Sequence, residues 1–123
     1  MISAKALLTI SLGLFLATIM TPAQQPPATS GSVHEVQVTA KKYQFTPDPI
    51  QVKKGERVRL FITAVDHDHG FQLDEFHIKE KIKKGQTATV EILADHAGTF
   101  PFHCSTFCGL GHHGMKGTLV VEE

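Results

Sequence analysis

The sequence predicts an all-β domain, a Greek-key β-sandwich or barrel. Two observations support this prediction: apolar and polar residues alternate along several short segments, and Gly-bearing turns separate those segments. No long segment shows the 3.6-residue apolar period of an amphipathic helix. Short alternating strands joined by frequent turns are typical of sandwiches and barrels.

The predicted strands follow one another from residue 33 to the C-terminal end. They cover residues 36–40, 43–46 with 50–52, 58–62, 87–93, 99–103 and 117–121. Pro47 and Pro49 interrupt the second of these segments, because proline cannot donate to a strand ladder. Residues 53–56 and 83–86 share a Lys-Lys-Gly pattern and predict turns. One helical fragment is expected, near residues 74–76.

The N-terminal residues predict export of the chain. Residues 6–20 carry no charge, Lys5 precedes them and small residues follow them, which is typical of a signal peptide over residues 1–23. As a helix this apolar run would span about 22 Å. That is shorter than the roughly 30 Å hydrocarbon core of a bilayer, so a short membrane anchor is the alternative. In either case we expect the rest of the chain in the periplasm or at the outer face of the cytoplasmic membrane.

The remaining residues divide into a linker and one domain. Residues 24–32 are rich in Pro, Ser and Gly and predict a flexible linker, so the folded domain is expected over residues 33–123. A chain of 123 residues that is 41% hydrophobic can form one domain with a modest core. Lys plus Arg and Asp plus Glu number 12 each, so the formal net charge is zero. Without an excess of basic residues, nucleic acid is not an expected partner.

The residues of greatest chemical interest lie just before the last predicted strand. Both cysteines of the chain, Cys104 and Cys108, stand here with His103, His112 and Met115. Thiolate, imidazole and thioether groups together favour copper, because magnesium and calcium prefer oxygen ligands and zinc sites rarely include methionine.

Two other interpretations of the cysteines are open. Two cysteines in an exported chain often form a disulfide, but closing so short a loop would restrict little chain entropy. A disulfide would also leave His112 and Met115 without a role. A structural zinc site would use both cysteines and two histidines, again with no role for Met115. The complete set of donors therefore favours copper.

The spacing C-S-x-F-C-G-x-x-H-x-x-M, residues 104–115, resembles the binuclear copper A motif of cytochrome c oxidase subunit II. Upstream, D-H-G-F at residues 68–71 is similar to the segment that carries the family's first histidine. Residues 117–121 are similar to the family's last strand. The resemblance extends from about residue 50 to the C-terminal end and implies a cupredoxin β-sandwich.

The resemblance also implies ligands for two copper ions. These are two bridging thiolates, one imidazole on each ion, one weak axial thioether and one backbone carbonyl group. In that order the residues are Cys104 and Cys108, His69 and His112, Met115, and Thr106. His67 is the alternative to His69, which is preferred because Gly70 and Phe71 follow it.

The function implied by the resemblance is one-electron transfer and not catalysis by the domain alone. The electron donor would be a cytochrome c or another small redox protein, and the acceptor would be the catalytic subunit of a heme-copper oxidase in a respiratory chain. The chain contains no Trp, which the family often uses to receive electrons, so Tyr43, Phe71 and Phe76 are candidates for that role. A soluble exported electron carrier and a copper-handling protein are the alternatives.

Overall fold

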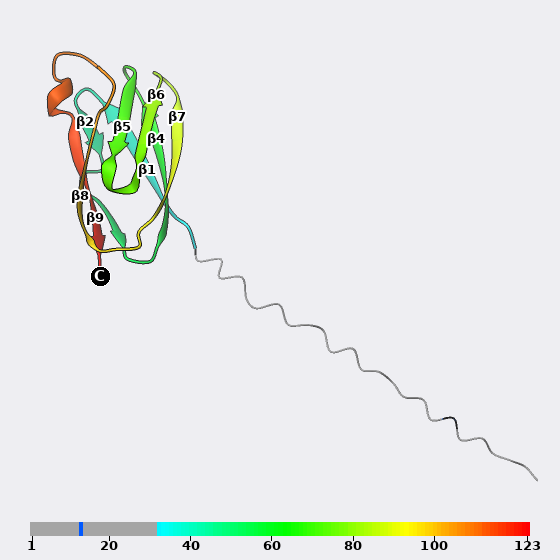
Figure 1. Ribbon diagram of the computed structural model, residues 1–123. Helices are drawn as coiled ribbons and strands as arrows, with labels where there is room; N and C mark the ends of the chain where they lie inside the picture. Colours follow the sequence, from blue (N-terminus) through cyan, green and yellow to red (C-terminus); the bar gives the residue numbers. More distant parts are fainter. Residues whose placement is uncertain (1–12, 14–31) are drawn as a thin grey trace, which may run out of the picture.

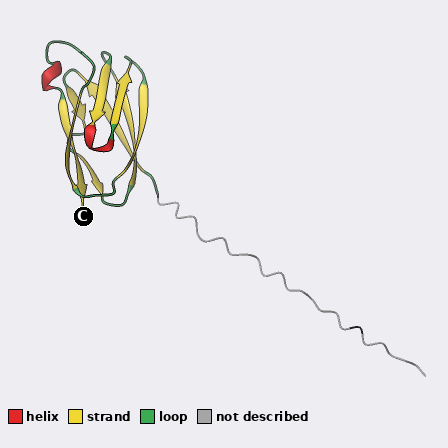
Figure 2. Cartoon of the chain, viewed as in Figure 1, coloured by secondary structure: helices red, strands yellow, loops and turns green. Residues whose placement is uncertain are grey.

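The computed structural model describes Gly13 and residues 32–123, and regular structure begins at His34 (Figures 1 and 2). The strands are β1 His34–Lys41, β2 Gln44–Thr46, β3 Ile50–Lys53, β4 Arg57–Ala64, β5 His69–Leu73, β6 Ile78–Ile82, β7 Thr87–Leu93, β8 Gly98–His103 and β9 Lys116–Glu122, with short 3-10 helices η1 Asp74–Phe76 and η2 His112–Gly114. None of the helices in the described part is long and apolar enough to cross a membrane. Apart from Gly13, the predicted signal peptide and nearly all of the linker lie outside the described residues.

The strands form two sheets, which confirms the predicted all-β sandwich. One sheet has the order β2-β1-β4-β7 and the other the order β3-β9-β8-β5-β6. Strand β1 pairs with β4 in parallel, β3 pairs with β9 in parallel, and the remaining pairs are antiparallel. The order of the strands differs from their order in the chain, so connections cross from sheet to sheet.

The core lies between the two sheets and follows from the alternation in the sequence. Every second residue of β4 is buried, from Val58 to Ala64. Three phenylalanines fill the space near the predicted metal ligands: the ring centroids of Phe45 and Phe102 are 5.2 Å apart, and those of Phe71 and Phe102 are 4.9 Å apart. Full burial of one such side chain contributes about 1.5–3 kcal/mol to folding.

One predicted segment proves to be two strands in different sheets. Strand β2 pairs with β1, whereas β3 pairs with β9. Pro47 and Pro49 lie between them, where the chain passes from one sheet to the other. The interruption by proline is therefore a change of sheet.

Strands β5 and β6 were not predicted, because neither shows a clear alternation of apolar and polar residues. Strand β5 has four buried residues out of five, so it lacks the polar alternation of a half-exposed strand. Strand β6 is an edge strand, and three of its five residues are exposed Lys or Glu. The short helix η1 between them agrees with the expected helical fragment.

Two ends of the sandwich are distinguished by what they carry. The first, called the cysteine end here, holds the β8–β9 loop of residues 104–115, the start of β5 and the β6–β7 turn at 83–86 (Figure 1). The opposite end holds the β3–β4 turn at 53–56 and the C-terminus (Figure 1). The register that pairs Lys53 with Glu122 fixes this arrangement.

Candidate metal centre

The β8–β9 loop places the cysteines and the methionine at one point. Cys104 follows the last residue of β8, and Met115 precedes the first residue of β9. The backbone N–H of Cys104 donates to the carbonyl oxygen of Met115 at 2.9 Å, so the β8–β9 ladder continues to the base of the loop. Both ends of the loop are thereby fixed.

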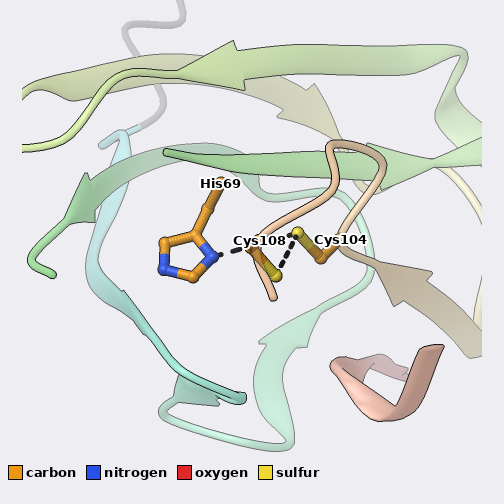
Figure 3. A group of neighbouring side chains, drawn as sticks. All are labelled: His69, Cys104 and Cys108. Atoms are coloured by element: carbon orange, nitrogen blue, oxygen red, sulfur yellow. Dashed lines mark hydrogen bonds between the residues drawn. The ribbon is translucent and has the colours of Figure 1, made fainter. Parts of the chain in front are cut away.

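The two cysteines are buried free thiols whose sulfur atoms face one another. Cys104 and Cys108 are almost fully buried, and their Sγ atoms are 3.5 Å apart (Figure 3). A disulfide bond would hold the sulfurs about 2.05 Å apart. The structure therefore contains two free cysteines here and not a disulfide bond.

His69 approaches this sulfur pair from the other side of the site, at the first residue of β5 (Figure 3). Its imidazole is fully buried, and Nδ1 lies 3.9 Å from Cys104 Sγ. Its Nε2 lies 2.8 Å from Asp66 Oδ1. A proton on Nε2, donated to Asp66, leaves the Nδ1 lone pair directed at the sulfurs, which is the tautomer that a metal ligand needs.

Asp66 holds that imidazole in place and is itself held. Its Oδ2 accepts the backbone N–H of Lys42 at 3.0 Å. Partial burial opposes the charge of the Asp66 carboxylate, but hydrogen bonds from His69 and Lys42 outweigh it and keep the pKa below its ordinary value. The sequence reasoning did not select Asp66. The available signal was an acidic residue three positions before a candidate ligand.

The remaining predicted donors lie around the same sulfurs. His112 Nδ1 is 3.7 Å from Cys108 Sγ, and Met115 Sδ is also 3.7 Å from Cys108 Sγ. The carbonyl oxygen of Thr106 is 3.1 Å from Cys104 Sγ. The structure therefore brings together all six residues that the family resemblance implied.

The alternative ligand, His67, does not lie among these donors. It is exposed, and its Nδ1 lies 3.1 Å from the carbonyl oxygen of Asp68. Strand β5 begins at His69, so residue 67 lies before the strand.

The two imidazoles lie at different sulfurs. His69, Cys104 and Cys108 have ligand atoms within 4.8 Å of one another, and His112 is not part of this group. With metal–sulfur bonds of about 2.3 Å and metal–nitrogen bonds of about 2.0 Å, two ligand atoms of one ion lie at most about 4.6 Å apart. A single Cys2His2 zinc site would need all four ligand atoms within that distance, and His112 lies outside the group.

The protein environment keeps at least one thiol protonated when no metal is bound. Burial, together with the hydrogen bond to Cys104, raises the pKa of Cys108 to about 12. The backbone N–H of Gly70 donates to Cys104 Sγ at 3.3 Å, as it would to a thiolate ligand. Metal binding at this site must therefore displace a proton from Cys108.

Close backbone contacts fix the shape of the loop. A Cβ atom on Gly70 would lie 2.7 Å from the backbone nitrogen of Thr106, so only glycine lets β5 approach the loop this closely. On the other side, a Cβ atom on Gly111 would lie 2.4 Å from the ring of Tyr43. The loop is thus packed between β5 and the aromatic ring of Tyr43.

The aromatic candidates for receiving electrons differ in exposure. Phe71 is fully buried in the core, so it is not a contact surface for another protein. Tyr43 is 39% exposed. The most exposed aromatic at this end is Phe107, at 68%, which stands between the two cysteines in the chain. Sequence reasoning missed it because an apolar residue in a ligand loop is not distinguishable from core by pattern alone.

Residues 9–121 match the family model of the cupredoxin-like domain. The chain belongs to the cupredoxin family. It is 34% identical over 102 residues to each of two sequences of cytochrome c oxidase subunit 2, both from Thermus thermophilus. The match covers 83% of this chain in both cases, with 76% of the first relative and 61% of the second. This cupredoxin domain is therefore homologous to subunit 2 of cytochrome c oxidase.

A solved structure of the same architecture supports the fold. The periplasmic domain of subunit II of cytochrome oxidase from Bradyrhizobium japonicum superposes with a TM-score of 0.68 at 21% identity, and the match covers 73% of this chain and 84% of that one. The homology and the buried group of one histidine and two cysteines together imply copper as the cofactor. The sulfur and nitrogen donors fit that metal.

Proposed function

We propose that this cupredoxin transfers single electrons through a binuclear copper A centre. The observation that supports the proposal most strongly is the buried sulfur pair with one imidazole at each sulfur. Cys104 and Cys108 would bridge the two ions, with His69 and His112 as one terminal ligand each. Met115 and the carbonyl group of Thr106 would be the weaker ligands. When bound, the copper pair would supply a one-electron redox couple.

The residues of the chain favour such a role because they hold the ligands rigidly. The 2.9 Å hydrogen bond between Cys104 and Met115 fixes the base of the loop, and Asp66 fixes the orientation of His69. Buried ligands with few alternative positions keep the same arrangement in both oxidation states. Little rearrangement then opposes electron transfer.

We further propose that the domain is exported and works with an oxidase complex. Two of its relatives are subunits 2 of cytochrome c oxidases, and residues 1–23 have the composition of a signal peptide or short anchor. The proposed donor is a cytochrome c or similar small carrier, and the proposed acceptor is the catalytic subunit of a heme-copper oxidase. A soluble exported carrier with the same centre is the alternative, and a cleaved N-terminal segment in the mature protein would favour it.

A reductive titration of the copper-loaded chain tests the proposal. We expect two copper ions per chain and the reversible uptake of one electron per chain. The Cys108→Ser variant should lose this behaviour, because one bridging sulfur is removed. Ser105→Ala, a change in the same loop that removes no proposed ligand, is the matched control and should keep it. Uptake of one electron per chain by Cys108→Ser with unchanged copper content would contradict the proposal.

A further inference from the structure

The cysteine end carries an exposed apolar tip in the loop that holds most of the proposed copper ligands. Leu110 is 97% exposed and Phe107 is 68% exposed, both in the loop that contains the two cysteines. The ring centroid of Phe107 lies 5.9 Å from that of His112. Apolar side chains held in water at a redox site are suited to contact another protein, because that contact removes their surface from water.

Positive side chains lie at the same end of the sandwich as this tip. Lys42 contacts Asp66 through its backbone, Lys81 pairs with Gly70 next to His69, and Lys116 follows Met115. The exposed lysines of the cysteine end are Lys41, Lys42, Lys81, Lys83, Lys84 and Lys116. Within the described residues, none of these six side chains lies in an ion pair.

The carboxylates at this end are fewer, and backbone groups already engage them. Asp48 accepts the N–H of Thr118 at 2.9 Å, Asp66 that of Lys42, and Asp68 that of Lys84 at 2.8 Å. The opposite end carries the acidic residues Glu56, Glu75, Asp95, Glu122 and Glu123 against the basic residues Lys53, Lys54 and Arg57. The formal net charge of zero therefore hides a positive cysteine end and a more acidic opposite end.

We propose that the cysteine end docks an acidic electron carrier, a small redox protein whose redox centre lies in an apolar patch surrounded by Asp and Glu. This inference rests on the proposed electron-transfer function. The lysines would attract and orient the carrier, and Phe107 and Leu110 would fill the contact at the centre. In the transfer, the carrier loses one electron and the copper centre gains one, and no bond or proton is exchanged.

Two turns with the same sequence provide a matched pair of variants. Lys83-Lys84-Gly85 lies at the cysteine end and Lys53-Lys54-Gly55 at the opposite end, and both glycines have positive φ, 79° and 89° (Figure 1). The variants K83E/K84E and K53E/K54E change the net charge equally. Only the first changes the charge near the proposed copper ligands.

The charge is tested by oxidising the reduced, copper-loaded chain with small one-electron oxidants. At low ionic strength we expect K83E/K84E to slow oxidation by the anion hexacyanoferrate(III) by about threefold or more, and to accelerate oxidation by the cation tris(phenanthroline)cobalt(III). K53E/K54E should change either rate much less. Equal effects of the two double variants, or no effect of K83E/K84E, would overturn the proposal.

The apolar tip is tested with reduced plant-type ferredoxin, an acidic one-electron donor. Leu110→Ser should slow reduction of the oxidised centre by ferredoxin, while oxidation of the reduced centre by hexacyanoferrate(III) stays unchanged. Equal rates with ferredoxin for Leu110→Ser and the unchanged chain would contradict docking through the tip. A membrane surface is the other outcome of the test. The chain would then bind phosphatidylglycerol vesicles, K83E/K84E would abolish this binding, and the same variant would leave the ferredoxin rate unchanged. That result would overturn the proposal.

A measurement without metal separates this inference from the proposed function. The metal-free chain should be retained on a cation exchanger, and K83E/K84E should elute earlier than K53E/K54E. Failure of the chain to bind two copper ions would refute the proposed function and leave the charge asymmetry in place. Identical elution of the two double variants would refute the charge asymmetry alone.

Discussion

The glycine at position 70 gives a sharp test of how β5 and the ligand loop fit together. In Gly70→Ala the added Cβ would lie 2.3 Å from Ser105 Oγ, 2.9 Å from Ser105 N and 2.7 Å from Thr106 N. The Ser105 side chain can rotate away, but the two backbone nitrogens can move only with the loop. Ordinary contact begins at 3.4 Å, so the loop must shift by about 0.7 Å at Thr106.

This shift has two measurable consequences. Overpacking of this kind destabilises a fold by about 1–3 kcal/mol, which urea unfolding of the metal-free chain measures. The shifted segment joins Cys104 to Cys108, so the copper-loaded variant should also show an altered electron paramagnetic resonance spectrum or a lower copper content. Both effects should occur together, because the same clash causes both.

Gly114→Ala is the control for Gly70→Ala. Gly114 lies in the same loop, but nothing stands within 4 Å of its added Cβ. Its free energy of unfolding should change by less than about 0.5 kcal/mol, and its spectrum should not change. A Gly70→Ala variant as stable as Gly114→Ala, with an unaltered spectrum, would refute the account of the close approach.

Three further predictions concern the ligands and the surface. Met115→Leu should keep the copper content but shift the reduction potential, which redox titration measures. The variant replaces a buried thioether with a side chain of similar volume that has no donor atom. Loss of copper would contradict the role of Met115 as a weak ligand. Asp66→Ala should lower copper affinity about 10–100-fold, measured by competition with a chelator, because His69 loses the partner that orients it; unchanged affinity would refute that role. Hydrogen bonds to Asp95 and then Glu75 raise the pKa of His96 above its ordinary 6.5, so the charged imidazole stabilises the fold at pH below about 6.5. That contribution is lost as pH rises through the folded-state pKa of His96. His96→Gln should therefore flatten this part of the curve of melting temperature against pH. An identical curve for the variant and the unchanged chain would contradict this role of His96.

The sequence predicted the architecture well where burial alternates along a strand. Strands β4 and β7 each pair within a sheet and bury every second residue over part of their length, so a period of two marks them. The sequence did not predict the hairpin of β5 and β6, because β5 is buried on nearly all sides and β6 lies at the edge of its sheet. Its position matters for function, since β5 carries His69.

The candidate site was more accessible to sequence reasoning than the surface around it. Donor chemistry pointed to copper at residues 103–115, the resemblance to cytochrome c oxidase subunit II implied the six ligands, and the structure places all six around one pair of sulfurs. Sequence reasoning did not identify Asp66 and Phe107, because their roles depend on which residues they contact and on how exposed they are. The positive cysteine end also escaped, because a net charge of zero contains no information about the distribution of charge.

The most direct test of the central claim is the electron paramagnetic resonance spectrum of the oxidised, copper-loaded chain, measured together with copper per chain. The binuclear account predicts two copper ions per chain and one unpaired electron shared equally between two copper nuclei. A spectrum from a single copper nucleus at one ion per chain would contradict it.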